Sequence, residues 1–432
     1  MGISLRPLRM KHLSLWLQDK AYFTDLVRTL NGFGDLDLVV EVARLPPDAR
    51  GEVHVRGWVP ASRTHQLTNT VENVTRGHCK ITFSDPDPEE EVPSLTHHNR
   101  FLRPFEKLVA SFGVPSYDEI DPTFFMAVSF MLVFSFMFAD VGHGLILVTF
   151  GIIAYVMGGK VKEQQGIFGY VLGSGGLLIV CGLSGLIGGV LLGEIFGYHV
   201  SFFPSQIALP RPLRIVLPFH PLENPMPMFR LSLLIGTLDI SFGLLLNIAN
   251  KLLARELRSA FFEGACWLWF YVGLMYSVFS YGFNLMALTS DPIMLWGILM
   301  PFSLMLIGKL GLEGLDGLMH FVEQIISTIS NSVSYLRILA LSLAHSIISS
   351  LILEVGGHNL VVAIVGALPA IALEGLIVFI HSTRLMWVEW FSKFYHGKGT
   401  PFKPKLLFDW EVYGVQPQYL ETVQVVSKQN SV

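Results

Sequence analysis

From residue 124 to residue 394 the chain is a series of long apolar runs joined by short polar connections. A helix needs about 20 apolar residues to cross the hydrocarbon core of a bilayer. Inside that core only helices and closed barrels satisfy all of their backbone hydrogen bonds, so runs of this length predict membrane-spanning helices. We expect about eight spans, at residues 124–138, 141–157, 168–196, 229–252, 261–288, 293–310, 315–353 and 361–394. The last two are long enough to tilt strongly or protrude.

The composition agrees with a polytopic membrane protein that has a soluble portion. Hydrophobic residues make up 51% of the chain and charged residues only 15%, with a mean hydropathy of +0.51. The predicted fold class is therefore mainly α: a polytopic membrane helical bundle with a small N-terminal α/β lobe. The net charge of −4 gives no reason to expect nucleic acid as a partner. The three cysteines lack the spacing of a metal site or a disulfide framework.

Polar residues follow one face of the run at residues 315–353. They are four, three, four and three residues apart, and no proline interrupts the run, so we expect one long helix with a polar stripe. The stripe consists of Glu323, Ser327, Ser330, Ser334 and Arg337, with His345 eight residues further on. A central arginine costs about 2.5 to 3.5 kcal/mol on insertion scales, so it needs a partner, a water-filled cavity or a function. The alternative is a buried ion pair or an arginine that reaches the membrane surface.

A second polar set lies in the run at residues 361–394. His381 and Arg384 follow Glu374 by seven and ten residues, which places all three on about one side of a helix. The two runs together carry two arginines, two carboxylates and two histidines. Each of these groups can hold or repel a proton, and water can fill the gaps between them. The pattern predicts a proton or ion path between two neighbouring helices.

The sequence around these groups resembles one family. The segment from Ser334 to His345, SYLRILALSLAH, is similar to the signature of the membrane a subunit of V/A-type rotary ATPases, which is called subunit I in bacteria and archaea. The segment that starts at His381, HSTRLMWVEWFSKFY, resembles the last helix of that family. GWVP at residues 57–60, residues 115–123 and DVGHG at residues 140–144 also match it. The resemblance covers about residues 52–410 and is strongest from residue 315.

The resemblance implies an ion-translocating stator beside a rotating ring of small c/K-type membrane subunits, each with a carboxylate. By this resemblance Arg337 separates two half-channels and Arg384 is the second arginine. The other candidate ion-translocation residues are Glu323, Ser327, Ser334, His345, Glu374 and His381. The family commonly has asparagine where this chain has Ser327, and Ile377 stands where a hydroxyl residue is usual. We therefore expect a drier or shifted channel lining.

The implied partners are the ring, the central and peripheral stalk subunits of a V/A-type ATPase, and membrane lipid. The chain has no Walker motif, so we expect no catalytic site, no cofactor and no metal, and ATP chemistry would belong to partners. Two alternatives of another class stay open. One is a stand-alone membrane transporter, which would work without a carboxylate ring, and the other is a non-transporting membrane scaffold.

Residues 1–92 have the pattern of a ferredoxin-like α/β lobe. Two strand-helix-strand units are expected, with strands at residues 10–17, 36–43, 52–59 and 79–83 and helices at residues 19–31 and 61–75. Family members usually carry a long coiled-coil arm between two such units. Here only a turn joins Val42 to Val53, so we expect the arm to be missing, which weakens the case for stalk contacts.

The remaining expected parts are a linker with a surface helix at residues 93–122, the eight-helix ion-translocating domain at residues 123–400 and a C-terminal tail at residues 401–432. Lysines and arginines follow the second, fourth, sixth and eighth spans, whereas only Arg211 and Arg214 stand out on the other side. This asymmetry predicts that lobe, tail and both termini are cytoplasmic. We expect a multi-pass protein of a prokaryotic inner membrane.

Three acidic groups lie in or beside the spans. At Asp140, in a tight turn between two spans, helix capping is favoured over a role in transport. Asp239 lies within a span, where a structural hydrogen bond and a role in an access channel have equal weight. Glu194, at the end of the glycine-rich third span, is expected at the membrane interface.

Overall fold

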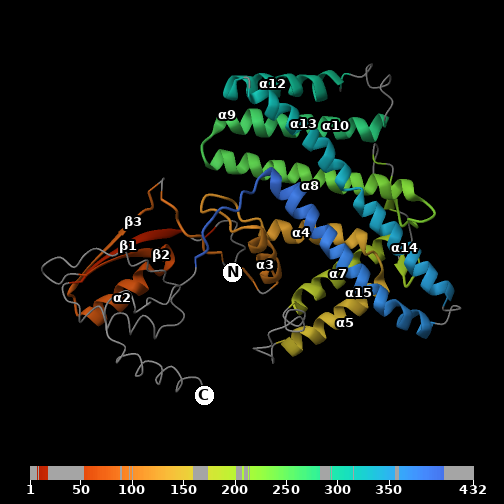
Figure 1. Ribbon diagram of the computed structural model, residues 1–432, viewed down its shortest axis with the longest axis horizontal. Helices are drawn as coiled ribbons and strands as arrows, with labels where there is room; N and C mark the ends of the chain where they lie inside the picture. The colour runs from red at the N-terminus through yellow and green to blue at the C-terminus, as the bar shows by residue number, and fades with distance from the viewer. Residues whose placement is uncertain are drawn as a thin grey trace. The chain divides into compact units, whose positions relative to one another are not determined.

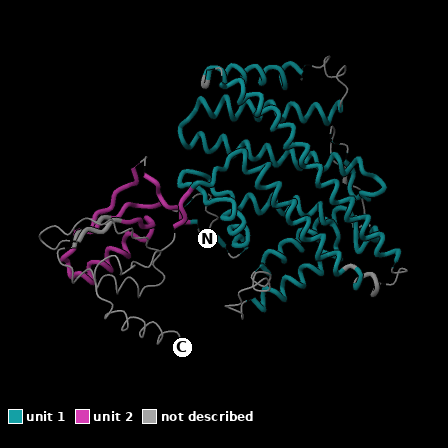
Figure 2. The backbone as a smooth tube through the Cα atoms, viewed as in Figure 1, with its two compact units in different colours: residues 1–7, 96–398 teal, residues 8–95, 399–432 magenta. Residues whose placement is uncertain are grey.

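The computed structural model describes residues 7, 9–17, 53–87, 90–96, 98–99, 101–158, 174–200, 207–208, 213, 215–282, 292, 294–314, 316–355 and 360–402. The chain divides into two compact units (Figure 2). One comprises residues 1–7 and 96–398 and is helical. The other comprises residues 8–95 and 399–432 and contains a small sheet.

The smaller unit is built on a three-stranded antiparallel sheet in the order β2-β1-β3 (Figure 1). Its elements are β1 (Met10–Leu17), β2 (Val53–Pro60), η1 (Ala61–Arg63), α2 (Thr64–Thr75) and β3 (Cys79–Ser84). Met10 of β1 lies opposite Pro60 of β2, and His12 lies opposite Ser84 of β3. Since β2 and β3 run in the same direction on either side of β1, β2-α2-β3 is a split strand-helix-strand unit.

Apolar side chains from one face of the sheet and from α2 are buried. They include Leu13, Leu15, Val59, Leu67 and Val71. The helix expected at residues 19–31, the strand expected at residues 36–43 and the turn that follows lie outside the described residues, and so do the tail from residue 403 and the charged positions Arg211 and Arg214.

The larger unit is a bundle of helices (Figure 1). Its α-helices are α3 (Arg103–Phe112), α4 (Thr123–Met137), α5 (Val141–Gly158), α7 (Gly175–Leu192), α8 (Pro225–Leu253), α9 (Leu257–Ser259), α10 (Cys266–Tyr281), α12 (Met300–Glu313), α13 (Asp316–Ser334), α14 (Arg337–Val355) and α15 (Leu360–Arg384). The π-helical segments η2 (Ala260–Ala265), η3 (Met294–Leu299) and η4 (Leu385–Trp390) and the 3-10 turn η5 (Phe391–Lys393) extend them. Two short hairpins are formed by β4 (Glu194–Ile195) with β5 (Tyr198–His199) and by β6 (Ile207–Ala208) with β7 (Val216–Leu217).

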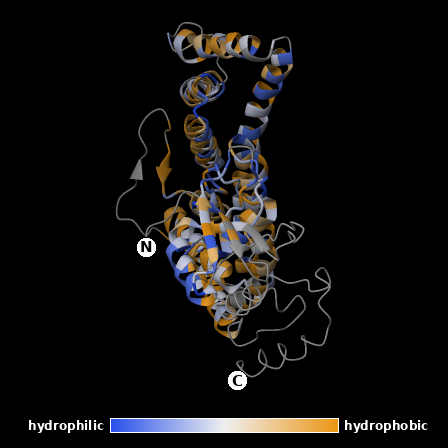
Figure 3. Ribbon diagram, turned by 90° about the vertical axis from the view of Figure 1, so that its left-hand side faces the viewer, coloured by the Kyte–Doolittle hydropathy of each residue, from blue (hydrophilic) through white to orange (hydrophobic). Residues whose placement is uncertain are grey.

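Within the described residues, six helices are long and apolar enough to cross a membrane. They are Val141–Gly158, Gly175–Leu192, Pro225–Leu253, Met294–Gly311, Asp316–Val355 and Leu368–Lys393. The first expected span is α4, which is apolar but 15 residues long, and the fifth is divided between η2 and the 16 residues of α10. The mainly α, polytopic membrane fold class is confirmed, and Figure 3 shows hydrophobic residues along the helices with hydrophilic patches among them.

α4 is apolar throughout and lies largely inside the bundle. It packs against α7, α8, α14 and α15. Ten of its 15 residues are buried, whereas Val128 and Leu132, one turn apart, are exposed on the remaining side. A helix that is hydrophobic all round belongs in a protein interior or in lipid, and the neighbouring helices provide most of that interior.

The seventh expected span is broken into two helices, which corrects the expectation of one continuous helix. Between α13 and α14, Tyr335 and Leu336 form a turn. The backbone N–H of Tyr335 donates to the carbonyl of Ser332 at 3.3 Å, and that of Leu336 donates to Val333 at 3.0 Å. These bonds reach three residues back instead of four, so the chain is locally overwound at the residues before Arg337.

The turn contains no proline or glycine, so the break results from packing against a neighbouring helix. Tyr335 is fully buried, and its ring lies against α8 at Gly236, where a Cβ atom would come within 2.6 Å of the ring. The ring therefore occupies space that only glycine leaves free on the neighbouring helix. A hydrogen bond from the hydroxyl group of Tyr335 also holds the ring in this position.

Candidate functional site

Arg337, the first residue of α14, is paired with a buried carboxylate. Its Nη2 atom donates to Oε1 of Glu389 at 2.9 Å. The side chain of Glu389 is 2% exposed and that of Arg337 is 22% exposed. Within the described part of the chain, Nη1 of Arg337 and Oε2 of Glu389 have no hydrogen-bond partner. Both of these atoms are buried, so the exposure of the Arg337 side chain comes from its other atoms.

Glu389 is a site residue that the sequence patterns did not single out. It lies on the π-helical segment η4, whose wider turn rotates the side chains that follow Arg384. Arg337 and Glu389 are 52 residues apart, so no periodicity within one helix could pair them. The available signal was a carboxylate inside the apolar segment that matches the family's last helix.

The second arginine lies on the open side of α15. Arg384 is exposed and makes no ion pair or hydrogen bond with any described residue. His381 lies one turn before Arg384, and the charges of both Arg337 and Arg384 act on it electrostatically. The structure therefore brings these three predicted residues together. Figure 1 shows that α15 and α14, which carry them, run alongside each other across the bundle.

The polar stripe of α13 does not face the protein core. Glu323 has a side chain that is 81% exposed, and Ser330 is exposed as well. Ser334 makes no side-chain hydrogen bond to a described residue. The buried hydroxyls of α13 lie on another face: Thr328 accepts a hydrogen bond from Trp267 at 3.0 Å, and Ser332 lies 3.2 Å from the hydroxyl of Tyr271.

An open cavity of about 310 Å³ lies beside the first half of the stripe. It is lined by Trp267, Lys309, His320, Glu323, Gln324, Ser327, Ser392 and Lys393. The ammonium of Lys393 donates to the hydroxyl of Ser327 at 3.3 Å and stands 4.9 Å from the centre of the Trp267 ring. Two predicted residues, Glu323 and Ser327, thus line a cavity with room for several water molecules, and two lysines line it as well.

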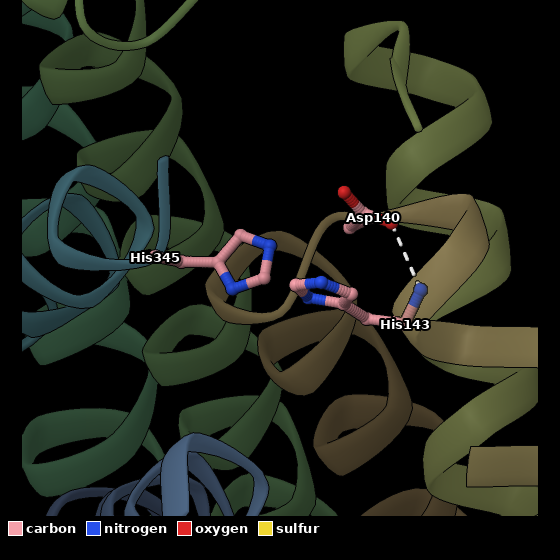
Figure 4. A group of neighbouring side chains, drawn as sticks. All are labelled: Asp140, His143 and His345. Atoms are coloured by element: carbon pink, nitrogen blue, oxygen red, sulfur yellow. Dashed lines mark hydrogen bonds between the residues drawn. The ribbon is translucent and has the colours of Figure 1, made fainter. Parts of the chain in front are cut away.

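A second polar region is a buried pair between α14 and α15. Nδ1 of His345 lies 2.9 Å from Oε2 of Glu374, and their side chains are 2% and 7% exposed. The ring of His143, from α5, stands perpendicular to that of His345 with ring centres 5.1 Å apart. Figure 4 shows His143 and His345 converging with Asp140 from three elements.

Asp140 caps α5, as the sequence predicted, and also reaches a second element. Its Oδ1 accepts the backbone N–H of His143 at 2.9 Å, and its Oδ2 accepts the backbone N–H of Gly197 at 3.2 Å. The turn is pressed against α7, because a Cβ atom on Gly189 would lie 2.3 Å from the backbone nitrogen of Val141. The glycines of the third span therefore fix the position of this carboxylate.

Glu194 extends this buried cluster towards the loops. The sequence placed it at the membrane interface, whereas the structure buries it, with 2% exposure, against the hydroxyl of Ser346 at 3.0 Å. Nε2 of His220 lies 3.8 Å from the same carboxylate. The ring of His220 is in turn 5.7 Å from that of His199, which is exposed. A chain of polar side chains thus connects the His345–Glu374 pair to the surface.

Asp239 forms structural hydrogen bonds at the helix break. It accepts a hydrogen bond from Tyr335 at 2.6 Å and another from Ser129 of α4. Because Tyr335 lies two residues before Arg337, this buried network positions the start of α14. The alternative role in an access channel has no observation in its support here.

Outside the spans, the chain before α4 is anchored to the end of the last helix. Tyr395 donates to the carbonyl of Gly113 at 2.7 Å, and Glu119 accepts the backbone N–H of His396 at 3.0 Å. Nearby, His98 and Asp121 form an ion pair of 3.0 Å. Burial lowers the pKa of His98, but the hydrogen bond and charge of Asp121 outweigh it and leave that pKa raised. Burial likewise raises the pKa of Asp121, but its hydrogen bonds to His98 and Thr123 leave it lowered.

Comparison with known proteins gives a consistent set of relatives. The model of the V-type ATPase 116kDa subunit family matches residues 46–214 and 315–407. The chain is 28% identical over 383 residues to the A-type ATP synthase subunit I of Methanocaldococcus jannaschii, an alignment that covers 81% of this chain and 54% of that protein. It is 31% identical to the subunit of the same name from Methanothermobacter thermautotrophicus, covering 84% and 53%. It is 32% identical to the V-type ATP synthase subunit I 2 of Treponema pallidum, covering 48% of each. The chain thus spans about half the length of the curated relatives that it matches.

Proposed function

The chain belongs to the V-type ATPase 116kDa subunit family, and on that basis we propose that it is an ion-translocating stator subunit of a V/A-type rotary ATPase. In this proposal it stands beside a ring of small c/K-type membrane subunits and forms two half-channels for protons or sodium ions. Arg337 separates the half-channels. Central and peripheral stalk subunits and membrane lipid are the further partners, and ATP hydrolysis belongs to other subunits.

The observation that carries the proposal is the partly exposed Arg337 between two polar regions. The open cavity at Ser327 lies ten residues before it along α13 and α14, and His345 lies eight residues after it. At about 1.5 Å per residue, these separations are about 15 Å and about 12 Å along the helix pair. One region supports a half-channel from the cavity, and the other supports a half-channel through the buried pair of His345 and Glu374.

The open side of these helices suits contact with an apolar partner. Large apolar side chains on α13, α14, α15 and η4 are exposed; they include Ile326, Ile329, Val333, Ile347, Leu376, Ile380 and Val388. Lipid and the helices of a membrane ring are both compatible with such a surface. The arginines on this side favour the second, because two cations facing lipid are costly whereas cations facing a ring carboxylate are stabilised.

A fixed cation explains the coupling physically. When a ring carboxylate passes Arg337, the positive charge favours the ionised carboxylate, so the bound ion is released into one half-channel. The charge also repels ions that would pass directly between the half-channels. Arginine suits this role because it stays protonated in environments where lysine can lose its proton. Glu389 holds the guanidinium in place through Nη2, and the side chain as a whole keeps 22% exposure towards the outside of the chain.

The test replaces Arg337 by alanine in the assembled complex and measures ATP-driven ion uptake in membrane vesicles. We expect coupled uptake to be lost while the subunit stays inserted. Arg258→Ala, at an exposed position of α9, is the matched control and should retain uptake. Retained coupled pumping in Arg337→Ala would refute the role of this residue. Purification of the wild-type chain without any ring of carboxylate-bearing subunits would favour a stand-alone transporter or a scaffold instead.

A further inference from the structure

We propose that Asp140, His143 and His345 form a binding site for a single divalent transition-metal ion of the zinc class. The sequence spacing indicated no metal site, because the three residues come from two distant parts of the chain. The metal site itself is independent of the proposed function. Its predicted effect on ion transport rests on that function.

The three side chains converge in the interior of the bundle (Figure 4). One potential ligand atom from each residue lies within 4.8 Å of the other two. Asp140 is fully buried, His143 is 1% exposed and His345 is 2% exposed. They come from the turn between α4 and α5, from α5 and from α14, so the site would join two separate parts of the bundle.

Two ring nitrogens in this group have no hydrogen-bond partner among the described residues. They are Nδ1 of His143 and Nε2 of His345, and both are inaccessible to solvent. Buried polar atoms are normally satisfied, so two buried imidazole nitrogens without a partner, on rings whose centres are 5.1 Å apart, call for a ligand. A metal ion accepts electron pairs from both at once.

Glu374 prepares His345 for this role. A carboxylate accepts hydrogen bonds, so its contact of 2.9 Å with Nδ1 of His345 places the proton on Nδ1. The lone pair is then on Nε2, the unpaired nitrogen. A carboxylate behind a metal-binding histidine is the usual arrangement in zinc sites, where it fixes the ring and increases its basicity.

The donor set identifies the class of metal. Two imidazoles and one carboxylate suit zinc and similar ions, whereas magnesium and calcium prefer oxygen ligands alone. Zinc bonds of about 2.0 to 2.1 Å place tetrahedral ligands about 3.4 Å apart, so the three donors need only modest side-chain rotations to close on an ion. A fourth position would be taken by water or by a carboxylate.

A route of metal-binding side chains leads to the site. His199 is exposed on β5, and its ring is 5.7 Å from that of His220. His220 contacts Glu194, which accepts a hydrogen bond from Ser346, the residue after His345. An ion captured at the exposed hairpin can therefore move inward through successive polar contacts.

Binding at this site would interrupt the ion path. In the proposed function His345 and Glu374 belong to a half-channel, and a metal ion on Nε2 of His345 would prevent that nitrogen from passing a proton. We therefore expect zinc to inhibit transport and a chelator to restore it.

The first experiment titrates the purified full-length chain in detergent with Zn²⁺ against a chromophoric chelator. We expect one ion per chain in the wild type and at least tenfold weaker binding in His143→Gln and in Asp140→Asn. Glu374→Gln should weaken binding by about 10- to 100-fold, as for other outer-shell carboxylates. The control is His396→Gln, which removes an exposed histidine that contacts a single carboxylate, Glu119, at 2.9 Å. Unchanged binding in the first two variants, or an equal loss in the control, would overturn the proposal.

The second experiment separates a ligand from a merely structural residue. His143→Cys replaces one zinc ligand by another, so X-ray absorption at the zinc edge should gain a sulfur neighbour at about 2.3 Å. The wild type should show nitrogen and oxygen neighbours alone. Zinc that binds the variant without a sulfur neighbour would show that residue 143 does not contact the metal.

Transport assays then test the consequence. Zinc should inhibit ATP-driven uptake by the wild-type complex and inhibit the His143→Gln complex at least tenfold less strongly. Binding without inhibition would refute the blocked path and leave the site in place. If no ring associates with the chain, the proposed function fails, whereas the binding data still decide the metal site.

Discussion

The two polar regions on either side of Arg337 are built in opposite ways. The region at Ser327 is an open cavity with two lysines and an exposed carboxylate, and the bond from Lys393 to Ser327 is long, at 3.3 Å. The region at His345 is closed. His345 and Glu374 are buried and paired at 2.9 Å, and further acidic residues and histidines lie beside them.

The difference shows what each environment requires of a charged group. Water in the open cavity can solvate the exposed Glu323, which needs no fixed partner. The lysines of this region are held by the protein, because Lys309 pairs with Glu263 at 3.1 Å and Lys393 is buried. In the closed region every titratable group loses its hydration and must obtain hydrogen bonds from the protein. The closed region should therefore tolerate substitution poorly, and the open region should tolerate it well.

The largest effect is expected where the two regions meet. Glu389→Ala removes the partner of Arg337 and leaves a guanidinium in a mostly buried position, which costs about 3 to 5 kcal/mol in comparable ion pairs. We expect lower thermal stability of the purified chain in detergent and loss of coupled uptake in vesicles. Wild-type stability in this variant would mean that Arg337 is solvated. The open region would then include Arg337, and the closed region would begin only after it.

A matched pair of glutamates tests the contrast directly. Glu374→Ala leaves His345 buried without its carboxylate and should lower the free energy of unfolding by about 1.5 to 3 kcal/mol. Glu323→Ala, at the open cavity, should change it by less than about 0.5 kcal/mol. Denaturant titration of both variants, followed by tryptophan fluorescence, gives the comparison. Equal effects would remove the distinction between an open and a closed region.

A pair of serines sharpens the comparison with a smaller change. Ser346→Ala deprives the buried Glu194 of its hydrogen bond of 3.0 Å and should cost about 1 to 2 kcal/mol. Ser327→Ala removes two long bonds at the cavity, from Lys393 and from Asn331, each of 3.3 Å, and we expect a change near zero. The same fluorescence titration measures both, and a larger loss in Ser327→Ala would reverse the assignment of the two environments.

The smallest effect is expected outside both regions, at the ion pair of His98 and Asp121. The raised pKa of His98 contributes stability that is complete below the ordinary value of 6.5 and is lost as pH rises through the raised pKa. The lowered pKa of Asp121 contributes stability above the ordinary value of 3.8 that is lost as pH falls through the lowered pKa. His98→Gln should therefore destabilise the chain most between the pKa of Asp121 and that of His98, by about 1 kcal/mol. The effect should become smaller as the pH rises through the raised pKa of His98.

Thermal unfolding across that pH range provides the measurement. His396→Gln is the control, since its exposed ring makes a single contact with Glu119. A destabilisation of His98→Gln that stays constant with pH would show that packing, and not the charge of the pair, is what the substitution removes.

Several features of the candidate site could be predicted from single helices. The spacing of Glu374, His381 and Arg384 predicted about one side of a helix, whereas in the structure Glu374 is buried and Arg384 is exposed. The capping role of Asp140 followed from its place before an apolar run, and its bond to the N–H of His143 confirms it. Periodicity was less informative for α13, because hydroxyl residues lie on two of its faces and only Thr328 and Ser332 are buried.

The sequence by itself determined the apolar spans, the polar faces of the last two of them and the family, because each depends on residue types and spacings along one stretch of chain. Tertiary structure decided the rest. The pairing of Arg337 with Glu389, the convergence of Asp140 and His143 on His345, and the burial of Glu194 all join residues from different helices. The break at Tyr335 likewise depends on Gly236 and Asp239 of a neighbouring helix. A repeat of 3.6 residues shows which side chains share a face, but only packing between helices decides what that face meets.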